Sequence, residues 1–199
     1  MTVGFLMATV AGRAADVPAP LNDFGEAAES AYDHVAAKDW KGAASDLKDT
    51  KAALEKMSKA KLATAGFAAE LAKLSTALDA KSRLAAMSAA NELTRLAAEA
   101  GRTFAPKLPT EILLLDYEGR EVVIQAEQGD PVRIRTAIAS IRASWDKVRP
   151  VAEAKRGSAK PVAAFSAAVA ALEHNTEVGK VAGLAKTLLD RVDDLEELF

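Results

Sequence analysis

Apolar residues recur at helical spacing in nearly every segment that lies between the prolines of this chain. The clearest case is the segment 131–150, where successive apolar positions are three or four residues apart: Ile134, Ile138, Ile141, Trp145 and Val148. This spacing puts all of these side chains on one face of an α-helix. Half of the residues are apolar but only 5% are aromatic, and the abundance of alanine favours closely packed helices over a β-sandwich.

We therefore expect an all-α protein, an up-and-down bundle of about six helices, in which residues 21–199 form a single domain. A shift of 91 positions aligns Asp39 and the apolar stripe that follows it with Asp130 and its stripe. The match is what a duplicated helix-pair unit would leave, with repeat halves 21–105 and 106–199. Two unrelated amphipathic helices that both begin at an Asp cap also match in part, so this second interpretation stays open.

The first eleven residues are uncharged and mostly apolar, and the small residues Gly12 and Ala14 follow them. We expect residues 1–20 to be a signal peptide and a linker, with cleavage after Ala14, and the protein to be periplasmic or secreted. The segment lacks the basic n-region of an ordinary signal peptide, and the alternative is an N-terminus that frays or docks on the core. No stretch approaches the ~20 apolar residues that a membrane span requires.

The charges exclude one class of partner, because 26 basic and 28 acidic residues are interspersed and give no basic surface for nucleic acid. With no cysteine, disulfides, thiolate zinc sites and iron–sulfur clusters are excluded. The sequence also has no phosphate-binding loop, nucleophile elbow, metalloprotease helix or helical Glu-x-x-His pair. We predict no catalytic residues, no metal site and no cofactor.

Residues 112–124 allow two interpretations. As a hairpin, they would turn at Glu118 and Gly119, but neither flank alternates polar with apolar residues. As a helix, which we favour, they present two apolar faces, one of them containing Leu113, Tyr117 and Ile124, and a polar arc containing Glu118, Glu121 and Gln125. Such a helix would be central in the bundle, and Gly119 would let a neighbouring helix approach closely.

Asp116 and Arg120 are the first candidate site, because the helical interpretation places them one turn apart between the two apolar faces, with Tyr117 beside them. A partly buried carboxylate next to an arginine could bind a polar ligand. The ordinary alternative is a structural ion pair, in which each group satisfies the other.

Three arginines spaced seven apart, Arg135, Arg142 and Arg149, form the second candidate site beside the apolar stripe of 131–150. Three guanidinium groups on one flank could clamp an anionic ligand or an acidic partner. More often such side chains pair with acidic residues of the next helix and pack their stems on the edge of the core.

These observations predict a non-enzymatic, exported helical-bundle module that binds a protein partner or a small ligand. The alternative is a carrier that holds a metal ion, haem or a small anionic ligand in its core. The helix pattern resembles that of exported four-helix-bundle proteins such as the cytochrome b562-like group. No haem-ligand motif of that group is present, so the resemblance implies a fold and no function.

Overall fold

The computed structural model describes residues 16–62, 65–175 and 177–199, and all regular structure within them is helical. The eight helices are α1 (Ala19–Ala36), α2 (Trp40–Lys59), α3 (Phe67–Asp79), α4 (Arg83–Gly101), α5 (Thr110–Gln128), α6 (Pro131–Glu153), α7 (Ala159–Glu173) and α8 (Val178–Glu196). The all-α prediction is confirmed, whereas the sequence predicted about six helices. The predicted signal peptide, residues 1–14, lies outside the described residues.

Three helix ends share one backbone conformation. Directly after α1, α2 and α3, the residues Lys38, Lys61 and Lys81 adopt left-handed backbone conformations, with φ of 62°, 57° and 50°. The next backbone N–H then bonds back to the helix, as from Ser82 to the Ala77 carbonyl at 2.8 Å. Glycine is the usual residue at such a position, so these ends carry no strong sequence signal.

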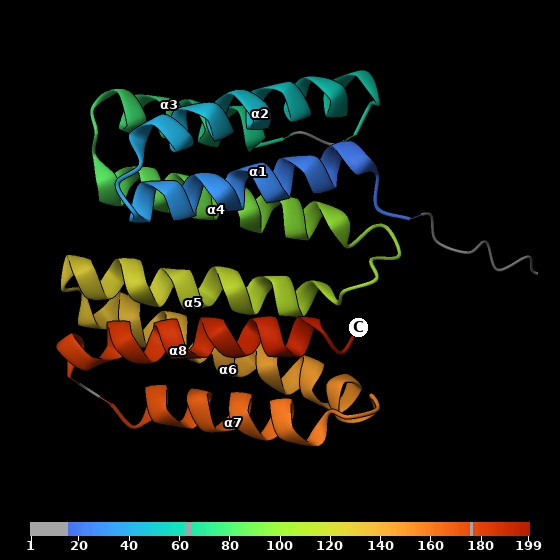
Figure 1. Cartoon of the computed structure of the whole chain (residues 1–199), viewed down its shortest axis with the longest axis vertical. Coiled ribbons are helices and arrows are strands. Elements are labelled where there is room, and N and C mark those ends of the chain that lie inside the picture. Colours follow the sequence, from blue (N-terminus) through green and yellow to red (C-terminus); the bar gives the residue numbers. More distant parts are fainter. Residues whose placement is uncertain (1–15, 63–64, 176) are drawn as a thin grey trace, which may run out of the picture.

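The helices form two groups of four that are connected alike (Figure 1). In the first group α1 contacts α2 and α4, and α3 contacts α2 and α4. In the second group α5 contacts α6 and α8, and α7 contacts α6 and α8. The buried apolar residues likewise form two clusters, one from α1–α4 together with Ile124 of α5 and one from α5–α8. The boundary falls between Gly101 and Thr110, where the sequence analysis divides the chain into halves.

The first two helices of each group begin at the same spacing. Helices α1 and α5 both follow a proline, Pro18 and Pro109, which are 91 residues apart. Helices α2 and α6 follow Asp39 and Asp130, also 91 residues apart, and each aspartate side chain accepts backbone N–H groups of its helix. The caps therefore repeat with the same shift as the apolar stripes.

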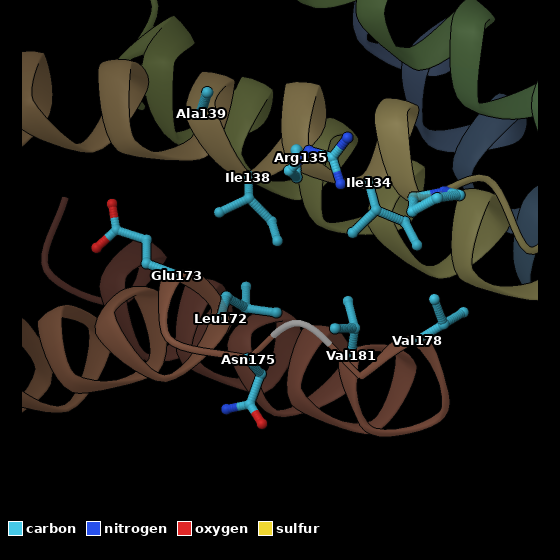
Figure 2. A pocket seen from close by; sticks show the side chains of 10 residues that line it. Ile134, Arg135, Ile138, Ala139, Leu172, Glu173, Asn175, Val178 and Val181 are labelled. Atoms are coloured by element: carbon cyan, nitrogen blue, oxygen red, sulfur yellow. The ribbon is translucent and has the colours of Figure 1, made fainter.

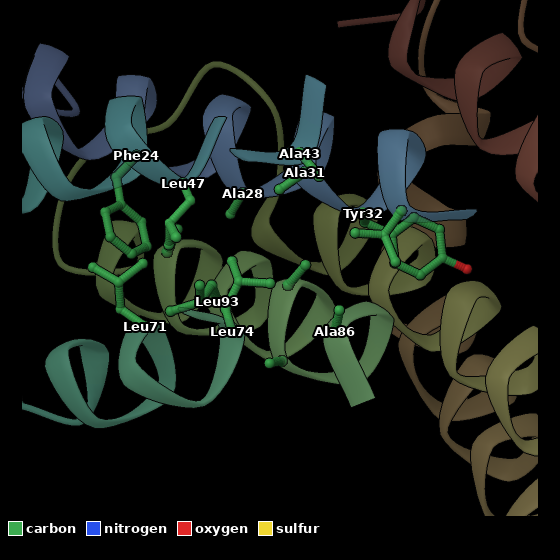
Figure 3. Packing of buried hydrophobic residues seen from close by; sticks show 14 of the residues in the cluster. Phe24, Ala28, Ala31, Tyr32, Ala43, Leu47, Leu71, Leu74, Ala86 and Leu93 are labelled. Carbon is green, nitrogen blue, oxygen red and sulfur yellow. The ribbon is translucent and has the colours of Figure 1, made fainter. Parts of the chain in front are cut away.

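In the first cluster, small alanines let α1, α2 and α4 pack closely around Phe24, Leu47, Leu74 and Leu93 (Figure 3). The rings of Phe24 and Phe67 meet edge to face with their centroids 4.9 Å apart. Tyr32 lies at the edge of this cluster. From there it contacts Arg120 of α5, between the two groups of helices.

Helix α5 is the central helix, as predicted, because it contacts α4 of the first group and both α6 and α8 of its own. The hairpin interpretation of 112–124 is wrong. A Cβ atom at Gly119 would lie 2.7 Å from Leu189 of α8, so glycine permits this close approach. Ile124 packs into the first cluster. Leu113, which the sequence analysis assigned to the second apolar face, is 38% exposed.

No helix in the described part of the chain has the length and apolarity needed to cross a bilayer.

Candidate functional site

The predicted pair Asp116 and Arg120 lies at the junction of the two groups of helices. Arg120 Nη2 is 2.8 Å from Asp116 Oδ2 and donates a 2.6 Å hydrogen bond to Glu29 Oε1 of α1. The guanidinium carbon lies 5.0 Å from the centre of the Tyr32 ring, also on α1, within cation–π range. Only 6% of the Arg120 side chain is exposed. Arg120 therefore ties α5 to α1 with most of its guanidinium removed from water.

Further carboxylates surround this arginine. Burial raises the pKa of Asp116 to about 7, Arg120 opposes the rise, and Glu29, Glu196 and Asp193 add to it. Burial likewise raises the pKa of Glu196, on α8, above its ordinary value. A single buried cation thus pairs with carboxylates of α1 and α5, and the nearby Glu196 of α8 adds negative charge. This geometry fits a structural clamp, and the ligand-site hypothesis for Asp116 and Arg120 remains a prediction.

Tyr117 does not join this cluster, because it faces α4. Its hydroxyl lies 3.5 Å from Glu92 Oε2, and its backbone carbonyl accepts a 3.0 Å hydrogen bond from Asn91 Nδ2. Asn91 also donates to Glu121 Oε1 at 2.9 Å. Burial, with Glu121 and Glu92 nearby, raises the pKa of Tyr117. These contacts join α4 to α5 on a different side of α5 from Arg120.

The three arginines of α6 do not act together. Arg142 makes two hydrogen bonds to Glu173 of α7, at 2.8 and 2.5 Å. Arg149 lies 3.6 Å from Glu153 of its own helix. Arg135 is exposed, and no carboxylate of the described residues lies within 4.0 Å of it. Two of the three arginines that the anion-clamp hypothesis requires are therefore already paired with carboxylates of the chain.

Arg135 lines a pocket of about 250 Å³ between α6 and the turn that joins α7 to α8 (Figure 2). The wall of the pocket is aliphatic, formed chiefly by Ile134, Ile138, Leu172, Val178 and Val181. Asn175, although it borders the pocket, points its amide away from it (Figure 2) and donates to the Ala171 carbonyl at 2.7 Å. This is an apolar cavity with one charge at its edge.

Glu118 is a buried acid that the sequence analysis assigned to a polar arc. It is only 9% exposed, and its Oε1 accepts a 2.9 Å hydrogen bond from Ser144 of α6. Its Oε2 has no hydrogen-bond partner among the described residues. Burial raises the pKa of Glu118 to about 7, against the lowering effect of Ser144. A helical wheel of α5 alone could not reveal this burial, because α6 covers that position.

Replacing Glu118 with glutamine is expected to stabilise the protein at pH 8 and to flatten its pH dependence. Because the pKa is raised in the folded state, Glu118 contributes stability that is complete below its unfolded pKa and is lost as the pH rises through about 7. The loss at pH 8 is about 3 kcal/mol. Urea denaturation at pH 5 and pH 8 measures it. Glu26→Gln, an exposed change on α1, should leave the profile unaltered, and an identical profile in Glu118→Gln would contradict the assignment.

Ser30, His34 and Asp46 form a cluster between α1 and α2 that the sequence analysis missed. His34 Nδ1 lies 2.6 Å from Asp46 Oδ2, and this hydrogen bond raises the pKa of His34. Ser30 donates to Asp46 Oδ1 at 3.1 Å and approaches the same Nδ1 at 3.4 Å. A catalytic triad needs the serine and the aspartate on opposite ring nitrogens. Here Nε2 instead faces Asp39, 3.9 Å away, so the cluster ties two helices together.

Among residues 16–62, 65–175 and 177–199, no group of three or more histidine or carboxylate side chains is placed to hold a metal ion.

Fold and sites together define an all-α protein with two connected four-helix groups and one aliphatic pocket edged by arginine. No protein-family model matches the chain, and no curated protein or solved structure is significantly similar to it. Any function must therefore be argued from the geometry of the chain itself.

Proposed function

We propose that this chain is a non-enzymatic binding module that works outside the cytoplasm. The proposal rests on the pocket beside α6. Among the described residues its wall is mainly aliphatic, and Arg135 is the one charged lining residue without an ion-pair partner. A cavity of this kind holds a ligand by shape and charge. It offers no nucleophile with an adjacent base, which covalent catalysis would need.

Two polar clusters, around Arg120 and around His34, support the same proposal, because both residues pair with carboxylates of the chain. Arg120 pairs with carboxylates of two helices, Glu29 of α1 and Asp116 of α5, and His34 is held between Asp46 and Asp39. Groups bound in this way contribute to the fold and are poorly placed to act on a substrate. The remaining candidate for ligand contact is Arg135.

A panel of anionic, neutral and cationic small molecules tests the proposal with the purified full chain. We expect at least one anionic compound to raise Tm in a concentration-dependent way, because a ligand at 100 times its Kd adds about 2.7 kcal/mol to stability. Mass spectrometry should recover that compound unchanged. Conversion in proportion to the amount of protein would overturn the non-enzymatic assignment, and a Tm unaffected by every compound would overturn the binding assignment.

The proposed location depends on the apolar, uncharged start of the sequence. Export and cleavage after Ala14 predict that mature protein from its own host begins at Ala15. Mass spectrometry of the intact protein gives the answer directly. An N-terminal Met1 would contradict export by a cleaved signal peptide.

We also propose that the two groups of helices arose by duplication of a four-helix unit. This unit is larger than the helix pair that the sequence suggested. The 91-residue spacing of the proline and aspartate caps supports it, as does the equal pattern of contacts in α1–α4 and α5–α8. Two copies of a bundle would allow one to serve as scaffold while the other keeps the pocket.

A further inference from the structure

The pocket beside α6 differs from a second cavity of the described residues in the side chains that line it. The second cavity, about 510 Å³, lies between α2 and α3 and is lined by Lys51, Leu54, Glu55, Ser58, Lys59 and Leu71. Charges of both signs border it, and its apolar wall consists of two leucines. The pocket beside α6 instead has a wall of at least four aliphatic side chains from α6, α7 and α8. Only the latter offers a ligand a continuous apolar surface.

The charge at the mouth of this pocket is positive. Glu173 also borders it (Figure 2), but the two hydrogen bonds from Arg142, 2.8 and 2.5 Å long, engage both of its carboxylate oxygens. Arg135 lies at the edge beside Ile134 and has no such partner among the described residues. An arginine of this kind favours a planar carboxylate, which it can bind through two parallel hydrogen bonds.

The size of the pocket limits the ligand. A cavity of about 150 Å³ lined by aliphatic side chains suffices for benzene, and drug-sized ligands occupy pockets of about 300 Å³ or more. At about 250 Å³, this pocket lies between the two. A short hydrocarbon chain fits such a volume, and its polar end would reach the solvent at the mouth.

We propose that the pocket between α6 and the α7–α8 turn binds a small amphipathic carboxylate, whose hydrocarbon chain packs on Ile134, Ile138 and Val178 and whose carboxylate pairs with Arg135. This inference rests on the proposed binding function and names the ligand class of that pocket. The aliphatic wall supplies affinity for the chain, at roughly 25 cal/mol per Å² of buried apolar surface. Arg135 selects the anion over neutral and cationic molecules of the same length.

Calorimetric titration of the full chain with octanoate, below its micelle concentration, tests the proposal, with octanol and octylammonium as neutral and cationic analogues. We expect saturable binding of one octanoate per chain. Arg135→Gln should weaken octanoate binding on the order of three- to tenfold and leave octanol binding unchanged. Added salt should also weaken octanoate binding, because it screens the exposed charge of Arg135.

Two further variants separate charge from shape. Arg149→Gln removes an arginine of the same row that pairs with Glu153 and should leave both affinities unchanged. Ala139→Leu fills the pocket from an exposed position and should weaken octanoate and octanol alike. Circular dichroism checks that each variant is folded.

Several outcomes would overturn the inference. Equal octanoate affinities for Arg135→Gln and Arg149→Gln would show that the carboxylate does not contact Arg135. An unaltered octanoate affinity in Ala139→Leu would show that the ligand binds outside this pocket. If octanoate fails to bind while another compound of the panel raises Tm, the ligand class is wrong and the binding function stands. If no compound raises Tm, or one is converted, the proposed function itself has failed.

Discussion

Replacing Trp145 with alanine is expected to lower the free energy of unfolding by about 3–5 kcal/mol, the usual range for deleting a large buried aromatic side chain. The Trp145 side chain is fully buried, and its ring centroid lies 4.6 Å from that of Phe165 on α7. The residue thus joins α6 to α7, two helices that otherwise share few contacts. The cavity left by alanine would open in the middle of the second apolar cluster.

Urea denaturation followed by circular dichroism measures this loss. Trp40→Ala is the matched control, because Trp40 is only partly buried at the start of α2, and it should cost clearly less. A loss under roughly 1 kcal/mol for Trp145→Ala would mean that the ring contributes little to the core and would contradict its assignment.

Replacing Arg120 with methionine is expected to lower the free energy of unfolding by about 3–5 kcal/mol at pH 8, because the buried Asp116 carboxylate then has no cation beside it. Asp116 would lose its 2.8 Å partner, and Glu29 its 2.6 Å hydrogen bond. Glu196 and Asp193, which already raise the pKa of Asp116, would add repulsion. The contact of the guanidinium with Tyr32 would also be lost.

Removing Asp116 should have a much smaller effect, because Arg120 keeps Glu29. Asp116→Asn is expected to cost about 1 kcal/mol or less at pH 8, and the double change Asp116→Leu with Arg120→Met should be milder than Arg120→Met alone. Equal and small losses from all three variants, measured by urea denaturation, would show that the junction does not depend on this pair. A structural pair also predicts no change in ligand affinity for Asp116→Asn.

The periodic pattern predicted the helices well because the apolar face of each helix follows from local spacing. The Asp130 cap, the buried stripe that includes Trp145 and the helical state of 112–124 are all confirmed. The same local logic does not predict the left-handed backbone at Lys38, Lys61 and Lys81, because the sequence offers no glycine there. Left-handed lysine costs roughly 1–2 kcal/mol relative to the right-handed form, and hydrogen bonds back to the helix hold it.

The contents of the junction could not be predicted, because its partners come from distant parts of the sequence. Glu29 lies 91 residues from Arg120, and Ser144 lies 26 residues from Glu118. A helical wheel shows which arcs of α5 are polar, yet it cannot show which neighbour covers an arc. For the same reason the sequence could not distinguish Arg142 from Arg135, because the partner of Arg142 is Glu173 of α7.

The central claim is a division of roles, in which the charges around Arg120 hold the two groups of helices together and the pocket beside α6 binds the ligand. Titration of the ¹⁵N-labelled full chain with octanoate, followed by amide chemical shifts, tests this most directly. The account predicts shifts concentrated at Ile134, Arg135, Ile138 and Val178, with Glu29, Asp116 and Arg120 unaffected. The largest shifts at Asp116 and Arg120, or no shifts at saturating octanoate, would contradict it.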